Sequence, residues 1–257
     1  MSRKFVAIIT TSAALLAGGL LVALTPGVAL GTIFEIGIQA TEIGASGASG
    51  ASGTSGASGA SGTGGVGGAS GPTGVSGVPS CPGTPCLAVS ETSGYQVKVG
   101  SDRSLMSVPH AGSIVAWTIT LGQPTAAQTA YFDSMEGGVA SAGIAILKAG
   151  KDLHYTLEAQ GPIVPLAKYF GETAQFPLPT TLKVKKGWIV ALTVPTWAPA
   201  LALGYANTTS WRASRPKKGC TTTSTQTAQE SIGTSVEYSC LYQTARLTYS
   251  ATLITTP

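Results

Sequence analysis

Charged residues are scarce in this sequence, and they leave little net charge. Only 10% of the 257 residues are charged, and the formal net charge is +4. Proteins that bind nucleic acids through their phosphates carry a strong basic patch or stripe. The weak positive charge therefore does not predict a nucleic-acid partner.

Catalytic and metal-binding motifs are also missing. The sequence has two histidines, His110 and His154, and no G-x-S-x-G elbow, H-E-x-x-H pair, phosphate loop or calcium-binding loop. Its acidic residues are scattered one at a time. We therefore predict a non-catalytic protein without a cofactor or metal ion. The alternative is an enzyme whose two carboxylates meet only when the chain folds.

Long apolar runs are absent after the N-terminus, which excludes a protein with several membrane spans. Arg3 and Lys4 precede an uncharged, largely apolar stretch that begins at Phe5, and Gly27-Val28-Ala29 has the small residues of a signal-peptidase site. We interpret residues 1–29 as a signal peptide, or alternatively as an uncleaved membrane anchor, since the run is long enough to span a bilayer. Either way we expect a secreted or cell-surface protein that contacts the membrane only through this segment.

Cysteine is limited to four residues that fall in two local pairs. Cys81 and Cys86 bound a short Pro/Gly-containing turn, and Cys220 and Cys240 bound a Thr/Ser-rich stretch. In an exported chain this predicts disulfide bonds, although three connectivities are possible. A zinc site is the alternative, but the spacing lacks paired knuckles.

Glycine, in contrast, follows a strict period in one segment. After a spacer at residues 30–43, the range 44–79 has glycine at every third position. The glycines of this series are Gly44, Gly47, Gly50, Gly53, Gly56, Gly59, Gly62, Gly65, Gly68, Gly71, Gly74 and Gly77. This is the period of the collagen triple helix, in which only glycine fits at the axis.

The composition of the Gly-x-y segment does not match its period. Residues 44–79 contain two prolines and no charged residue, whereas collagen-like sequences contain about 15–20% proline or more. Two interpretations stay open, a triple-helical rod of about 110 Å and a flexible linker with a mean span of about 33 Å. A rod implies a homotrimer formed through the stalk.

The segment from 44 to 79 resembles bacterial collagen-like surface proteins, which join a Gly-x-y stalk to a compact head. Val108-Pro109-His110-Ala111-Gly112-Ser113-Ile114-Val115-Ala116-Trp117 resembles a pattern in secreted actinobacterial β-sandwich proteins. The stretch from Phe176 to Trp188 is similar to the late strands of complement-type and tumour-necrosis-factor-type trimeric heads. These resemblances imply a β-sandwich head and carry no activity over to this chain.

The head, residues 92–257, follows a cysteine-bounded turn at residues 80–91. Its apolar residues alternate along the chain, and it contains no clear amphipathic helix. This pattern predicts an all-β antiparallel sandwich or jelly roll. The expected strands are Tyr95–Val99, Ser113–Leu121, Ala130–Met135, Ala140–Lys148, His154–Gln160, a hairpin over Leu182–Val194, Ala202–Tyr205, Ser235–Tyr242 and Ala245–Ile254.

One stretch of the head combines aromatic and basic residues in the way that binding loops do. The candidate ligand-binding residues are Trp197, Trp211, Arg212, Arg215, Lys217 and Lys218. Stacking on an aromatic ring and cation–π contacts would suit an anionic glycan or the cell wall. The leading hypothesis is a structural or adhesive protein whose stalk presents the head to a glycan, the cell wall or another surface protein. The alternative is a carbohydrate- or cell-wall-binding module that uses residues 211–218.

Overall fold

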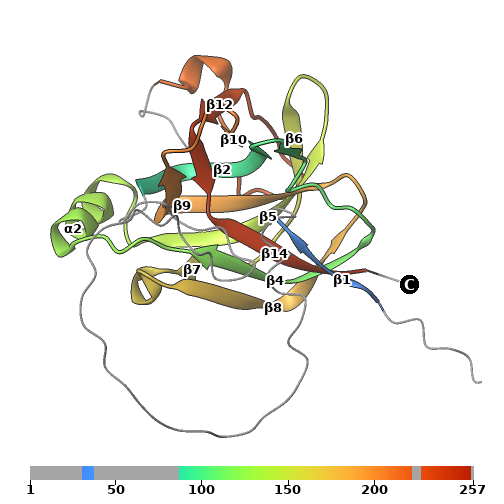
Figure 1. The fold of residues 1–257 in the computed structure, drawn as a ribbon, viewed down its shortest axis with the longest axis horizontal. Helices are drawn as coiled ribbons and strands as arrows, with labels where there is room; N and C mark the ends of the chain where they lie inside the picture. The colour runs from blue at the N-terminus through green and yellow to red at the C-terminus, as the bar shows by residue number, and fades with distance from the viewer. Residues whose placement is uncertain (1–30, 38–86, 222–226, 256–257) are drawn as a thin grey trace, which may run out of the picture. The chain divides into compact units, whose positions relative to one another are not determined.

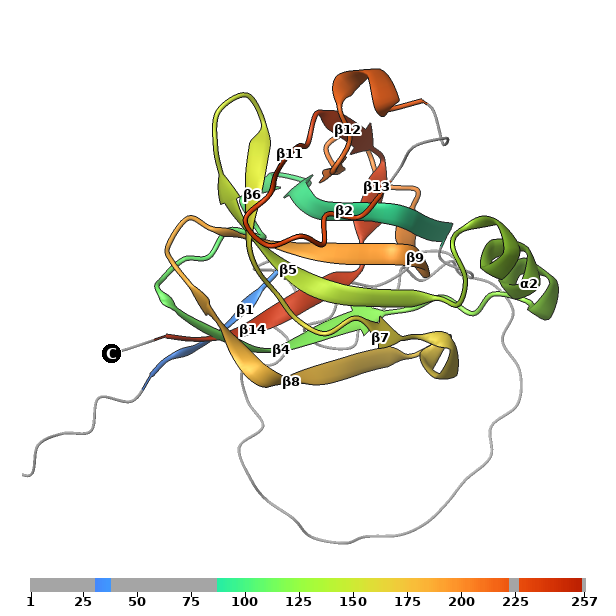
Figure 2. The ribbon, with the colours of Figure 1, turned by 180° about the vertical axis from the view of Figure 1, so that it is seen from behind.

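Two antiparallel sheets form the domain. The computed structural model describes residues 31–37, 87–221 and 227–255, all of which belong to one compact unit, Gly31–Pro257. Both views show β4, β8 and β14 on one side of the domain and β2, β5 and β9 on the other (Figures 1 and 2). The predicted all-β sandwich is therefore confirmed.

The smaller sheet has four strands in the order β1-β14-β4-β8. These are β1 (Ile33–Ile36), β14 (Tyr249–Thr255), β4 (Gly112–Thr120) and β8 (Thr173–Val184). Along β4 the apolar side chains of Ile114, Trp117 and Ile119 are buried, and β14 adds Tyr249, Ala251 and Leu253. This sheet supplies one wall of the core.

The larger sheet follows the path β11-β6-β5-β9-β2-β10-β12. The strands of this path are β11 (Ser235–Glu237), β6 (His154–Gln160), β5 (Ser141–Ala149), β9 (Ile189–Leu203), β2 (Leu87–Val99), β10 (Ser210–Ala213) and β12 (Cys240–Gln243). Three short strands pair at its sides: β3 (Asp102–Arg103) with β2, β7 (Val164–Pro165) with β5, and β13 (Ala245–Leu247) with β9.

The order of the longer strands is that of a jelly roll. Eight longer strands can be ranked from first to eighth along the chain: β1, β2, β4, β5, β6, β8, β9 and β14. By rank, the smaller sheet has the order 1-8-3-6, and the larger sheet has the order 5-4-7-2. A double-sheet jelly roll has eight strands arranged as two Greek keys. Strands β10 to β13 are an insertion between the seventh and eighth strands. β10 and β12 build one edge of the larger sheet, β11 pairs with β6 at the other edge, and β13 pairs with β9.

The chain enters the domain earlier than the sequence indicates. Strand β1 lies within residues 30–43, expected as a spacer, and pairs with β14 in the register Ile33↔Ile254 to Ile36↔Ala251. Strand β2 begins at Leu87, within the expected turn at 80–91. The Gly-x-y segment 44–79 therefore connects two strands of one domain. Residues 1–29, that segment, Cys81 and Cys86 lie outside the described residues.

One predicted strand is wrong. Residues Ala130–Met135 belong to the helix α2 (Ala126–Met135), which begins with a capping box. The Gln128 backbone N–H donates to the Thr125 hydroxyl at 3.2 Å, and the Thr125 N–H donates to the Gln128 side chain at 2.9 Å. No residue of this helix is buried, so it shows no apolar periodicity. Among the described residues, neither this nor any other helix has the length and apolarity needed to cross a membrane.

The expected strand Ala245–Ile254 is in fact two strands in different sheets. β13 pairs with β9, and β14 pairs with β4. Thr248 lies between them, where its hydroxyl is 2.6 Å from the Thr120 carbonyl oxygen and 3.0 Å from that of Ala200. The expected strand Ser235–Tyr242 is likewise divided into β11 and β12, and residues 202–203 continue β9. The other expected strands are confirmed, with bounds shifted at several ends.

Candidate functional site

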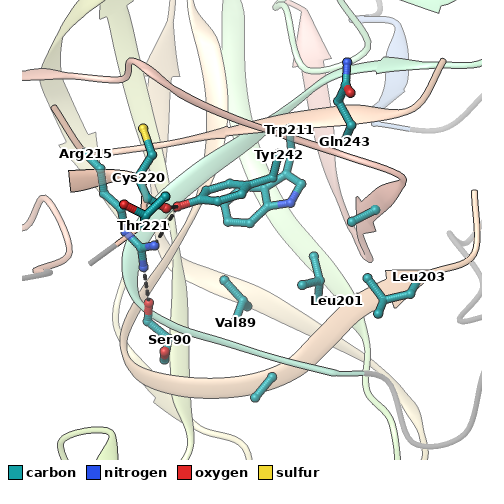
Figure 3. A pocket seen from close by; sticks show the side chains of 12 residues that line it. Val89, Ser90, Leu201, Leu203, Trp211, Arg215, Cys220, Thr221, Tyr242 and Gln243 are labelled. Carbon is teal, nitrogen blue, oxygen red and sulfur yellow. Dashed lines mark hydrogen bonds between the residues drawn. The ribbon is translucent and has the colours of Figure 1, made fainter. Parts of the chain in front are cut away.

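A pocket opens at the edge of the larger sheet that β10 and β12 build. Its volume is about 400 Å³, within the range of small-molecule sites. Strands β2, β9, β10, β12 and β13 contribute to its lining, and Figure 3 shows the rings of Trp211 and Tyr242 above Val89 and Leu201. The lining residues are Ala88, Val89, Ser90, Leu201, Leu203, Trp211, Arg215, Cys220, Thr221, Tyr242, Gln243 and Ala245.

An aromatic pair forms one wall of the pocket. Trp211 on β10 and Tyr242 on β12 are direct cross-strand partners, and their ring centroids lie 4.8 Å apart at an interplanar angle of 31°. Trp211 is 4% exposed, whereas Tyr242 is half-buried. Gly94 on β2 makes room for the indole, because a Cβ there would lie 2.9 Å from the Trp211 ring. The aromatic wall is therefore fixed by three strands.

Arg215 stands at one end of this wall. Its Nη1 donates to the Tyr242 hydroxyl at 2.8 Å, and its Nη2 donates to the Ser90 carbonyl oxygen at 3.3 Å. The Tyr242 hydroxyl in turn donates to the Cys220 carbonyl oxygen at 3.1 Å. Among the described residues no carboxylate forms an ion pair with Arg215, and its buried Nε has no hydrogen-bond partner.

A disulfide holds the loop that carries Arg215. Cys220 and Cys240 are bonded, which is one of the pairings that the sequence leaves open, and Cys240 is fully buried on β12. The 3₁₀ helix η2 (Lys217–Gly219) lies directly before Cys220. Since alternate residues of a strand share a face, Cys240 and Tyr242 point the same way, and the bridge keeps the Cys220 carbonyl beside the Tyr242 hydroxyl.

The other predicted binding residues do not line the pocket. Trp197 is fully buried, and its indole N–H donates to Asp133 on α2 at 2.9 Å. Arg212 follows Trp211 on β10, so it projects from the opposite face, where it donates to the carbonyl oxygens of Tyr238 and Ser239. Trp197 therefore secures α2 to the sheet, and Arg212 secures the segment before β12.

Lys217 and Lys218 are exposed on η2, next to the pocket residues Arg215 and Cys220 along the chain. They do not line the pocket. Both can raise the positive potential around its entrance. Of the six predicted binding residues, the structure therefore brings two, Trp211 and Arg215, into one cavity.

Sequence reasoning missed the partners of these two residues. Tyr242, Ser90 and the apolar floor of Val89, Leu201 and Leu203 come from strands that are far apart in the sequence. One signal was available, since Tyr242 follows Cys240 by two residues and so shares its face. The pairing of β2 with β9 and β10 has no such local signal.

A second cavity, of about 480 Å³, lies at β7, η1 (Ala167–Tyr169) and β8. The rings of Tyr169 and Phe176 pack there in a T-shaped arrangement, with centroids 5.1 Å apart. The Lys168 ammonium lies 5.0 Å from the Tyr169 ring centroid. Its remaining lining residues are Val164, Pro165 and Ala167. Its cation is the exposed Lys168, whereas the first pocket contains the half-buried guanidinium of Arg215.

Chemically, the Trp211–Tyr242 pocket is equipped to bind. Its lining includes one cation, hydroxyl groups and an amide, but no carboxylate or histidine that would act as a general acid or base. Elsewhere in the described chain, His110 lies against Phe34 at 5.1 Å and the His154 Nδ1 lies 3.1 Å from a backbone oxygen. No protein family, curated protein or solved structure matches the chain.

Proposed function

We propose that this chain is an exported, non-catalytic binding protein whose jelly-roll domain takes a small ligand in the Trp211–Tyr242 pocket. The observation that carries the proposal is the half-buried guanidinium of Arg215, which has no carboxylate partner among the described residues and stands beside an aromatic pair. A charged group that is removed from water without an ionic partner is costly. A ligand that supplies the missing partner would reduce that cost.

The pocket is organised before any ligand arrives. Hydrogen bonds fix Arg215 to Tyr242 and Ser90, and the disulfide fixes Cys220 to β12. Groups that are already ordered lose little conformational entropy on binding. This arrangement supports recognition of a ligand by a rigid site.

Export is supported by two independent features. The disulfide Cys220–Cys240 is typical of oxidising compartments outside the cytosol. The basic and apolar start of the sequence has the organisation of a signal peptide or anchor. We propose that the domain works in the medium or at the cell surface.

A ligand screen by thermal unfolding of the full chain tests the binding function. A compound that binds the native pocket stabilises the folded chain by RT ln(1 + L/Kd), where L is the compound's free concentration, so the melting temperature rises with the logarithm of L once L exceeds Kd. We expect this rise to be lost in Tyr242→Ala and kept in Tyr131→Ala, a control on the exposed face of α2. A chain that no organic acid, sugar or peptide stabilises would contradict the proposal.

A structural or adhesive role of the Gly-x-y segment is a second candidate. The observation that favours it is that β1 and β2 belong to the same domain, so the segment is attached to that domain at both of its ends. In this arrangement the domain displays the segment, whereas in the stalk hypothesis the segment displays the domain. A glycan or wall polymer that binds the whole chain, but not a variant with residues 44–77 removed, would support this role.

A further inference from the structure

We infer that the Trp211–Tyr242 pocket is specific for a small organic carboxylate with an apolar or aromatic body. This inference rests on the proposed binding function and names the ligand class. It replaces the carbohydrate that the alternative hypothesis from the sequence assigns to residues 211–218. Three features of the pocket support it: the charge at one end, the apolar wall at the other, and the size of the cavity.

The charged end calls for an anion. Arg215 carries five N–H donors, and the structure assigns one bond each from Nη1 and Nη2 to neutral oxygens. The Tyr242 hydroxyl already accepts from Arg215 and donates to Cys220, so it does not compensate the charge. No lining residue is acidic. Guanidinium pairs with carboxylate and phosphate groups in bidentate geometry, and the single cation of the lining matches the single charge of a carboxylate.

The opposite end calls for an apolar body. Figure 3 shows Arg215, Cys220 and Thr221 together at one end and Leu203 at the other, with Leu201 and Val89 on the floor between. Ala88 and Ala245 complete this apolar surface. A ligand that matches it has its charge at one end and carbon along the rest, because burying apolar area contributes about 25 cal/mol per Å².

A sugar matches this wall poorly. Its hydroxyls point in many directions, and each one that is buried without a partner costs free energy. Trp211 is 4% exposed and already packs against Tyr242, so its ring leaves no open face for a pyranose to stack on. The aromatic pair acts as a side wall rather than a platform.

The volume limits the ligand to one small molecule. A cavity of about 400 Å³ lies near the lower end of the range for drug-sized ligands. The exposed Lys217 and Lys218 can draw an anion toward the entrance. Their effect falls as salt is added, whereas the Arg215 contact is less screened because the guanidinium is half-buried.

Titration of the full chain with three matched probes tests the inference. The probes are 3-phenylpropanoate, its neutral amide, and glucuronate, an anion without an apolar body; binding is followed by calorimetry. We expect the carboxylate to bind at least about tenfold more tightly than the amide, as a charge-assisted hydrogen bond predicts. Glucuronate should bind more weakly than 3-phenylpropanoate.

Variants locate the effect. Arg215→Gln should weaken 3-phenylpropanoate about tenfold or more and change the amide by less than about twofold. Arg215→Lys keeps the charge and should keep the preference for the carboxylate, which separates loss of charge from loss of folding. Arg103→Gln, at an exposed position of β3, removes the same charge elsewhere and should leave all affinities unchanged.

The outcomes test the proposed ligand class separately from the proposed binding function. Equal affinity for carboxylate and amide, tighter binding of glucuronate, or an unchanged affinity in Arg215→Gln overturns the ligand class. If another compound then stabilises the chain through Tyr242, the binding function stands. If no probe binds and no other compound stabilises the chain, both are wrong.

Discussion

Single residues set the shape of the pocket. Gly94 is the clearest case, because its hydrogen faces the Trp211 ring at a point where two strands of the larger sheet meet. Arg215 and Tyr242 are held by mutual hydrogen bonding rather than by local sequence. A small change at any of these positions should therefore affect ligand binding more than the fold.

Gly94→Ala tests the first of these contacts. The added methyl would lie 2.9 Å from the indole and 3.0 Å from the Arg212 carbonyl oxygen, so we expect the ring to shift, at a cost of about 1–3 kcal/mol of stability. Urea unfolding and ligand titration measure the two effects. Gly219→Ala is the control, since its methyl meets Pro216 at an ordinary 3.6 Å. Unchanged stability and binding in Gly94→Ala would contradict the described packing.

Three buried tyrosines predict a loss of stability at alkaline pH. Burial raises the pKa of Tyr95, Tyr238 and Tyr249 well above the ordinary value of 10.0. The unfolded chain therefore releases these protons first, so stability holds below pH 10 and falls as the pH rises above it. Phenolate absorbance should show a subset of the eight tyrosines ionising only on unfolding. Reversible ionisation of all eight near pH 10 in the folded protein would contradict this prediction.

At the scale of elements, the sequence was informative wherever a strand has one buried face. His154–Gln160 is predicted and observed with the same bounds. The hairpin expected over Leu182–Val194 is also present, and its turn contains Gly187 at a φ of +82°. The helix α2 was missed because it buries no residue. The crossing from β13 to β14 was missed because Arg246, Thr248 and Ser250 are buried despite being polar. Pairing between distant strands has no local signal, and this also hid most of the pocket.

The pairing of β1 with β14 predicts a specific cross-link. Glu35 and Thr252 are register partners, and the Thr252 hydroxyl donates to the Glu35 carboxylate at 2.5 Å. Directly opposed residues have Cβ atoms about 4.5–5.5 Å apart, so Glu35→Cys with Thr252→Cys should form a disulfide within one chain. Peptide mapping by mass spectrometry reads it.

The control pair is Phe34→Cys with Thr252→Cys, in which the two side chains leave opposite faces of the sheet. It should not cross-link. For the Glu35→Cys and Thr252→Cys pair, a disulfide between two copies of the chain, in place of one within a copy, would mean that β1 pairs with a neighbouring molecule.

For the whole molecule, the position of the Gly-x-y segment bears on oligomeric state. Residues 44–77 as a triple helix would span about 105 Å, and residues 38–43 and 78–86 together reach back at most about 54 Å. The remaining distance of about 51 Å is about three times the radius of gyration of about 17 Å expected for such a domain. A triple helix over all of residues 44–77 is therefore incompatible with the pairing of β1 with β14 in the same chain.

We accordingly predict a monomer, although the glycine period by itself suggests a homotrimer. Light scattering of the full chain measures the mass, and Gly53→Ala with Gly56→Ala should leave both the mass and the thermal stability unchanged. A trimer that these substitutions dissociate would show that the collagen period forms a rod and that β1 leaves the domain.

The binding site itself is tested most directly by nuclear magnetic resonance. Titration of the full chain with 3-phenylpropanoate should shift the indole N–H of Trp211, which lines the pocket, and leave that of Trp197, which is bonded to Asp133, in place. Backbone shifts should gather at Tyr242, Arg215 and Leu201. Shifts that gather instead at the Tyr169–Phe176 cavity, or no shift at saturating ligand, would contradict the account.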